Sequence, residues 1–110
     1  MRAYLIDEIS QPDMEGIIAF LKQHSIKSSL DKIFWVKMPE NLLTGGQFDH
    51  TDCKPHIFAV EVGRNWIKLE FFIRSLKGLK CECQAYGNHQ QIDFIINYSH
   101  QILNSLDIKT

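Results

Sequence analysis

The chain has 110 residues, of which 45% are hydrophobic and 23% are charged, and its formal net charge is −1. This length suits one domain spanning residues 1–110, and the composition is that of a folded globular protein rather than a disordered chain. A nearly neutral chain has no long-range field for phosphate backbones or anionic membrane surfaces, so neither nucleic acid nor a membrane is expected as a partner.

The N-terminal residues and the cysteines indicate a cytoplasmic setting. Acidic Asp7 comes too early for the apolar region of a secretory signal, and no run approaches the roughly 18 apolar residues that span a bilayer. The chain has three cysteines, and an odd number is a poor disulfide framework. We therefore expect a cytoplasmic protein whose thiols are free or bind a metal.

The N-terminal third predicts a strand, a helix and a second strand. Residues 2–7 favour a short strand, although they lack clean alternation. A helix over 12–24 carries an apolar stripe at helical spacing, and Ser10 suits its N-cap. Residues 32–38 read as a strand that ends before Pro39, because proline cannot donate to a strand ladder.

Residues 39–55 form a connection that is long for a compact domain. We expect a short helical turn over 40–43, which the Gly45-Gly46 pair then ends. A connection of this length is either locally ordered or functional.

The stretch from His56 to Leu76 predicts a β-hairpin, and the rest of the chain is arranged to cover it. Gly63 and Arg64 suit a two-residue turn, which sets Val60 opposite Ile67. Alternation then places one set of apolar side chains on the core face: Phe58, Val60, Ile67, Leu69, Phe71 and Ile73.

A loop over 77–88 leads to the clearest helix of the sequence. Apolar residues keep helical spacing over about four turns, with Asn88 as N-cap and Gln91 placed to complete a capping box. The predicted fold is α+β: an antiparallel sheet of three to four strands with two helices packed on one face, a two-layer sandwich.

Cysteine and histidine residues gather at the hairpin edge opposite the turn. The sequence H-x2-C-x2-H enters the first hairpin strand, and a C-x-C pair follows the second. Zinc accepts a tetrahedral set of thiolates and imidazole, so the candidate ligands are Cys53, Cys81 and Cys83 with either His56 or His50. We predict His56 as the fourth ligand. The alternative is that these are free thiols and surface histidines, since the spacing matches no strong zinc motif.

The outer face of the hairpin is the second candidate site. An aromatic and cationic surface is predicted there, formed by Trp35, Trp66, Lys68 and Arg74, although Glu61 and Glu70 share that face. Exposed tryptophans suggest a protein partner or a homodimer contact. No pairing of a cysteine nucleophile with a histidine base stands out, so no catalytic residue is predicted and a non-enzymatic role is favoured.

The segments FWVKMPENLLT, DHTDCKPH and LEFFIRSLK, followed by CEC and a C-terminal helix, resemble a family of small uncharacterised bacterial proteins. The resemblance implies one domain and a prokaryotic cytoplasmic setting, and it carries no functional residue. Two hypotheses follow from the sequence. The first is a binding or accessory domain that acts through its sheet face without a cofactor, and the alternative is a zinc-binding domain.

Overall fold

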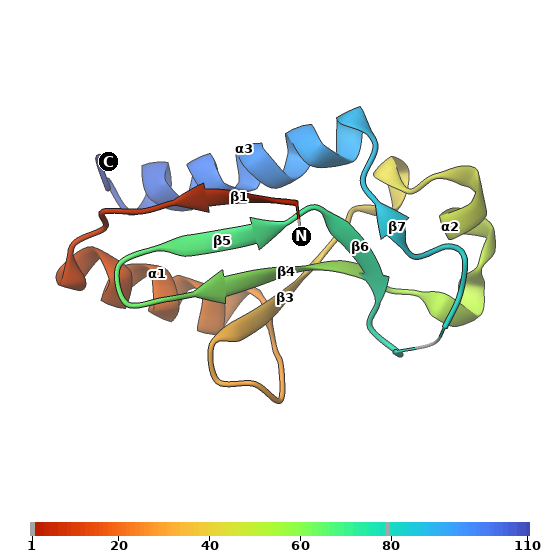
Figure 1. Ribbon diagram of the computed structural model, residues 1–110, viewed down its shortest axis with the longest axis horizontal. Helices are drawn as coiled ribbons and strands as arrows, with labels where there is room; N and C mark the ends of the chain where they lie inside the picture. Colours follow the sequence, from red (N-terminus) through yellow and green to blue (C-terminus); the bar gives the residue numbers. More distant parts are fainter. Residues whose placement is uncertain (1, 79) are drawn as a thin grey trace.

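The computed structural model describes residues 2–78 and 80–110. Within them lie three α-helices, α1 (Gln11–His24), α2 (Gly45–Asp49) and α3 (His89–Ser105), and two short 3₁₀ helices, η1 (Glu40–Leu42) and η2 (Thr51–Cys53). The strands are β1 (Ala3–Ile6), β2 (Ile26–Lys27), β3 (Ile33–Lys37), β4 (His56–Val62), β5 (Ile67–Glu70), β6 (Phe72–Ser75) and β7 (Ala85–Tyr86). The fold is α+β, as predicted (Figure 1).

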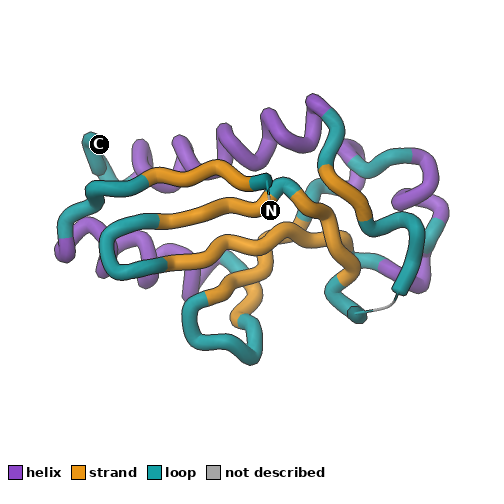
Figure 2. The backbone as a smooth tube through the Cα atoms, in the orientation of Figure 1, coloured by secondary structure: helices purple, strands orange, loops and turns teal. Residues whose placement is uncertain are grey.

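The strands pair antiparallel throughout the described residues. Their main order is β1-β5-β4-β3-β2, while β6 pairs with the start of β4 on one side and with β7 on the other (Figure 2). The prediction of three to four strands is wrong, because the sheet has seven in the part of the chain described. Two of these, β2 and β7, have two residues each and are too short to show alternation.

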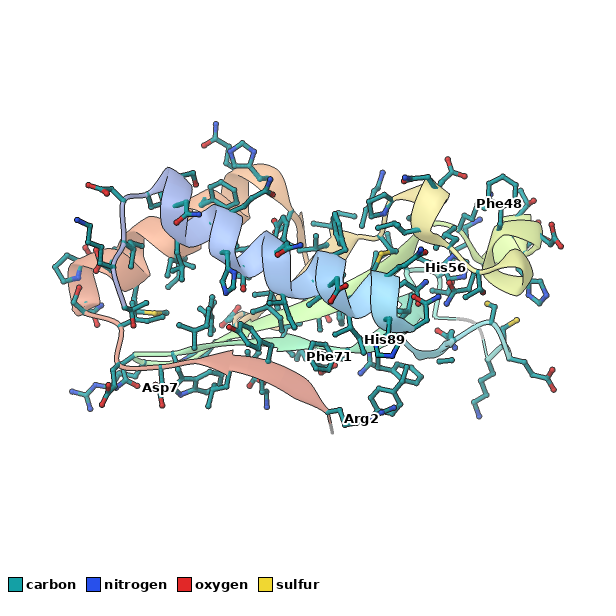
Figure 3. The ribbon with its side chains drawn as sticks, turned by 90° about the horizontal axis from the view of Figure 1, so that it is seen from above. Arg2, Asp7, Phe48, His56, Phe71 and His89 are labelled. Atoms are coloured by element: carbon teal, nitrogen blue, oxygen red, sulfur yellow. The ribbon has the colours of Figure 1, made fainter. Side chains whose placement is uncertain are left out.

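One face of the sheet carries the core, and both long helices pack against it. Buried side chains of the sheet meet buried side chains of α1 and α3 in one cluster, which includes Met14, Ile17, Leu21, Phe34, Phe58, Val60, Ile67, Leu69, Ile73, Ile95 and Ile102. Figure 3 shows both helices on the same side of the sheet. The predicted core face is confirmed except for Phe71, which is only partly buried.

The hairpin turn differs from the predicted one. Val62 is paired with Ile67 and Val60 with Leu69, so the loop has four residues and the register is shifted by two. Gly63 N–H donates to the Trp66 carbonyl at 2.8 Å, and the Trp66 indole lies so close to Gly63 that a Cβ there would overlap it. A shift of two preserves side-chain parity, which is why the core face was predicted correctly from the wrong turn.

The second hairpin strand is broken at Phe71. The Phe71 N–H donates to the Arg2 carbonyl, and its own carbonyl accepts from Gly87 N–H, so this backbone bonds to segments outside β4. Beyond the break, β6 pairs with β4 in a new register in which His56 faces Ser75. The break carries the chain toward β7 and the end of the sheet where the cysteines lie.

Side-chain caps start each α-helix. Ser10 caps α1, and Asn88 with Gln91 forms the predicted capping box of α3. A second capping box, formed by Thr44 and Gln47, starts α2 at Gly45. The glycine pair therefore begins a helix instead of ending one, because Thr44-x-x-Gln47 satisfies the free N–H groups of a new helix.

Candidate metal centre

Four metal-ligand side chains converge at one end of the sheet, and they come from two segments. His50 directly follows α2 and Cys53 ends η2, whereas Cys81 and Cys83 lie between β6 and β7. One imidazole nitrogen of His50 and the three sulfur atoms all lie within 4.8 Å of one another. No pair of these cysteines forms a disulfide, so three thiols are present together.

Short backbone hydrogen bonds fold the segment that carries His50 and Cys53. The Cys53 N–H donates to the His50 carbonyl at 3.0 Å, and Lys54 N–H donates to Thr51 at 3.2 Å. These bonds form the 3₁₀ turn of η2, whose tight winding brings residues three apart onto the same side. The spacing H-x2-C thereby turns both donor side chains toward the C-x-C loop.

Ser75, at the end of β6, ties the two ligand segments together. Its hydroxyl donates to the Cys53 carbonyl at 2.6 Å, and its backbone N–H donates to the side-chain carbonyl oxygen of Gln84 at 2.7 Å. Gln84 in turn donates its backbone N–H to the Cys81 carbonyl at 3.1 Å. Because Ser75 is buried, this bridge holds the cysteine-bearing backbones in register beneath the surface.

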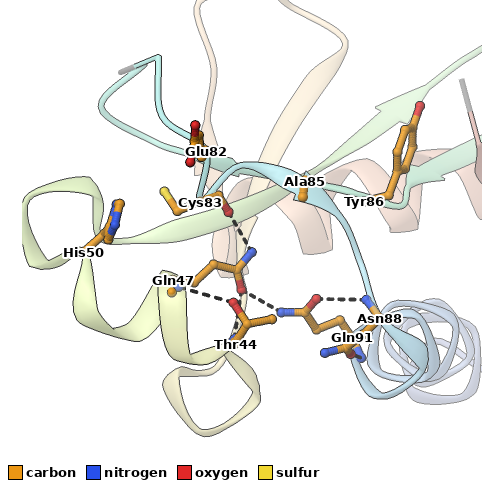
Figure 4. Close-up of a pocket in the computed structure, with 10 residues that line it drawn as sticks. Thr44, Gln47, His50, Glu82, Cys83, Ala85, Tyr86, Asn88 and Gln91 are labelled. Carbon is orange, nitrogen blue, oxygen red and sulfur yellow. Dashed lines mark hydrogen bonds between the residues drawn. The ribbon is translucent and has the colours of Figure 1, made fainter.

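A pair of buried glutamine amides connects the C-x-C loop to both capping boxes (Figure 4). Gln47 Nε2 donates to the Cys83 carbonyl at 3.0 Å, and Gln91 Nε2 donates to Gln47 Oε1 at 2.8 Å. The same two side chains accept the N-cap N–H groups of Thr44 and Asn88. One amide network thus fixes the position of Cys83 relative to the starts of α2 and α3.

The three thiols differ in their tendency to ionise. The backbone N–H of Cys83, with further donors including the neighbouring thiols and His50, lowers the pKa of Cys81 to about 7. Burial, with the adjacent cysteines, raises the pKa of Cys83 to about 12, and burial also raises the pKa of Cys53. His50 Nδ1 lies 2.9 Å from Cys81 Sγ. Cys81 therefore ionises near neutral pH, whereas Cys53 and Cys83 need a nearby cation to stabilise their thiolates.

The predicted ligands are found as follows. Cys53, Cys81 and Cys83 meet as predicted, and the histidine that joins them is His50 instead of the predicted His56. His56 lies beside the cluster, buried at the start of β4, with Nε2 3.4 Å from Cys83 Sγ. Its parity in β4 matches that of Phe58, so its ring points toward the core side of the sheet.

A pocket of about 370 Å³ adjoins the cluster (Figure 4). His50 and Cys83 contribute to its wall together with the Gln47 and Gln91 amides. Sequence analysis did not predict this pocket, since Gly45-Gly46 was interpreted as a helix stop. The signal that could have revealed its wall is the spacing Thr44-x-x-Gln47, a capping-box pattern.

The predicted binding surface lies on the sheet face opposite the helices. Its members Trp35, Trp66, Lys68 and Arg74 are all half-buried. Lys68 pairs with Glu61 at 3.3 Å, and Arg74 pairs with Glu70 at 2.9 Å, so carboxylates neutralise both cations. A protein partner or a second copy of the chain at this surface stays a prediction.

Searches against protein-family models, curated proteins and solved structures give no match for this chain. The resemblance to a family of small bacterial proteins therefore stays a prediction. Among the described residues, no helix has the length and apolar character needed to cross a membrane.

Proposed function

We propose that the protein is a metal-binding domain in which His50, Cys53, Cys81 and Cys83 hold a zinc ion. The supporting observation is the convergence of their four donor atoms within 4.8 Å of one another. In tetrahedral zinc sites the zinc–sulfur bond is about 2.3 Å, which separates two sulfur ligands by about 3.8 Å. No sulfur–sulfur distance would therefore have to shorten by more than about 1 Å for the three thiolates to bind one zinc ion.

The donor chemistry favours zinc over other metals. Thiolates and imidazole suit zinc, whereas calcium and magnesium require oxygen ligands. Iron–sulfur clusters are usually held by four cysteines, and this chain has three. A reducing compartment such as the cytoplasm suits the centre, because it keeps the thiols available as ligands.

The ligand count favours a structural role. Four protein donors fill a tetrahedral site, whereas catalytic zinc sites keep one position open for water or substrate. The ion would join the segment 50–53 to the segment 81–83, neither of which contributes a described side chain to the hydrophobic core cluster. Metal binding would therefore stabilise this end of the sheet and increase the free energy of unfolding.

Titration of the reduced, metal-free protein with cobalt(II) tests this function. Cobalt bound by thiolates in a tetrahedral site gives intense absorption bands, and zinc displaces it. We expect one equivalent to bind, and we expect His50→Ala to weaken binding at least about tenfold. The matched control is His89→Ala, since His89 is exposed and lies outside the cluster. Absence of thiolate–cobalt bands in the wild type would refute the function.

A further inference from the structure

Exposure distinguishes the three thiols of the cluster. Cys53 is 5% exposed and Cys83 is 8% exposed, whereas Cys81 is only partly buried. A small solute therefore reaches Cys81 Sγ before it reaches the other two sulfur atoms. His50 Nδ1, 2.9 Å from that sulfur, can donate a hydrogen bond to a thiolate there.

Sequence spacing determines which thiol can form a disulfide with Cys81. All three sulfur atoms lie within 4.8 Å of one another, so distance alone permits either partner. Cys81 and Cys83 are separated by one residue, which disfavours an unstrained bridge. Cys53 comes from a different segment and is free of that restriction.

We infer that Cys81 is a site of oxidation by hydroperoxides and that Cys53 resolves the oxidised form as a Cys53–Cys81 disulfide. The modification would remove two of the four donors from the metal centre and release its ion. Only this release rests on the proposed zinc function, since disulfide formation needs the two thiols alone.

The reaction balances with a hydroperoxide as the oxidant. The Cys81 thiolate attacks the terminal oxygen of ROOH, the O–O bond breaks, and a sulfenic acid forms on Cys81, while the leaving alkoxide takes up the proton that the Cys81 thiol lost and departs as ROH. The Cys53 sulfur then attacks the Cys81 sulfur and displaces hydroxide, which leaves as water with the Cys53 proton. Two thiols lose two electrons and two protons, and the hydroperoxide takes them up to give ROH and water.

Peptide mapping of the wild-type protein tests the inference directly. The protein, metal-free or zinc-loaded, is treated with one equivalent of hydrogen peroxide, alkylated and cleaved after glutamate. Glu82 lies between Cys81 and Cys83, so this cleavage places the two thiols in different peptides. We expect the peptides of Cys53 and Cys81 to be joined, with Cys83 alkylated. A chromophoric chelator then reports zinc release from the loaded sample.

Variants identify the order of the two steps. In Cys53→Ser, oxidation should stop at a sulfenic acid on Cys81, which a 1,3-dione traps. In Cys83→Ser, the Cys53–Cys81 disulfide should still form. Cys81→Ser should slow the loss of thiols by about tenfold or more, because the remaining two are buried. Far-ultraviolet circular dichroism checks that each variant folds. If a variant does not fold, the peptide map of the wild-type protein still tests the inference.

The outcomes separate this inference from the zinc function. A Cys53–Cys83 disulfide, or oxidation of Cys81→Ser at the wild-type rate, would overturn the inference. A Cys53–Cys81 disulfide in a protein that binds no metal would support the modification site while refuting the zinc function. Tight zinc binding with no peroxide-induced disulfide would support the zinc function while refuting the modification site.

Discussion

His56 Nε2 lies 3.4 Å from Cys83 Sγ, while the Nδ1 atom of the same ring is buried without a hydrogen-bond partner among the described residues. A buried N–H without an acceptor is rarer in proteins than an unpaired acceptor, so the ring favours the tautomer protonated at Nε2. In that form it donates to the Cys83 sulfur. In the proposed metal centre, His56 would thus support the ligand Cys83 through an outer-shell hydrogen bond.

Replacing His56 with Phe should weaken zinc binding without abolishing it. The change keeps most of the side-chain volume but removes the donor to Cys83, and loss of such a supporting contact costs about 10–100-fold in metal affinity. Competition titration with a chelator of known affinity measures the effect. If His56→Phe abolished binding and His50→Ala left it intact, His56 would be the ligand in place of His50.

In metal-free protein, Cys81 should be alkylated at lower pH than the other cysteines. Its pKa is lowered to about 7, so its thiolate is present above pH 7 and lost as the pH falls below that value. The pKa of Cys83 is raised to about 12, so that thiol stays protonated across the same range. Iodoacetamide labelling between about pH 5.5 and 9, resolved after cleavage at Glu82, should show Cys81 reacting first. Preferential labelling of Cys53 or Cys83 would contradict the assigned ionisation order.

Replacing Gln91 with Ala should destabilise the fold by about 2–4 kcal/mol. The side chain completes the α3 capping box with Asn88 and donates to the Leu42 carbonyl and to Gln47 Oε1, so its loss leaves several buried groups unpaired. Urea unfolding measures the change. The matched control is Gln101→Ala, an exposed position of the same helix, which should shift stability by less than about 0.5 kcal/mol. Equal effects of the two variants would rule out a structural role for the amide pair.

Local patterns in the sequence predicted most of the architecture. The apolar stripe of α1, the capping box of α3 and the alternation of β4 and β5 are properties of a few neighbouring residues, and all are found in the structure. The three cysteines were also assigned together correctly, because the hairpin places the end of β6 beside the start of β4.

The errors concern features that depend on contacts between distant residues. The turn length could not be read from Gly63-Arg64 alone, because β4 and β5 also pair with β3 and β1, which are distant in the sequence. The choice between His50 and His56 depends on α2, which was not predicted. The side of the sheet that His56 faces could have been predicted, because His56 is two residues before the core residue Phe58 in β4 and side chains two apart in a strand point to the same face.

Replacing Gly63 with Ala should destabilise the protein by about 1–3 kcal/mol, because the new Cβ would overlap the Trp66 indole and force it to move. Gly46→Ala serves as the control. Nothing lies within 4 Å of a Cβ at that helical position, so the substitution should be stabilising by about 0.5–1 kcal/mol. Thermal unfolding of the two variants and the wild type measures both changes in stability. A stable Gly63→Ala protein with unchanged Trp fluorescence would show that the indole does not pack on Gly63.

Native mass spectrometry of reduced protein reconstituted with zinc tests the central claim most directly, because it counts ions on intact chains. We predict one zinc ion per chain in the wild type and its loss in Cys81→Ser, with the ion retained in His89→Ala. A wild-type chain that carries no zinc, or one whose zinc survives Cys81→Ser at unchanged affinity, would contradict the assignment of His50, Cys53, Cys81 and Cys83 as the metal centre.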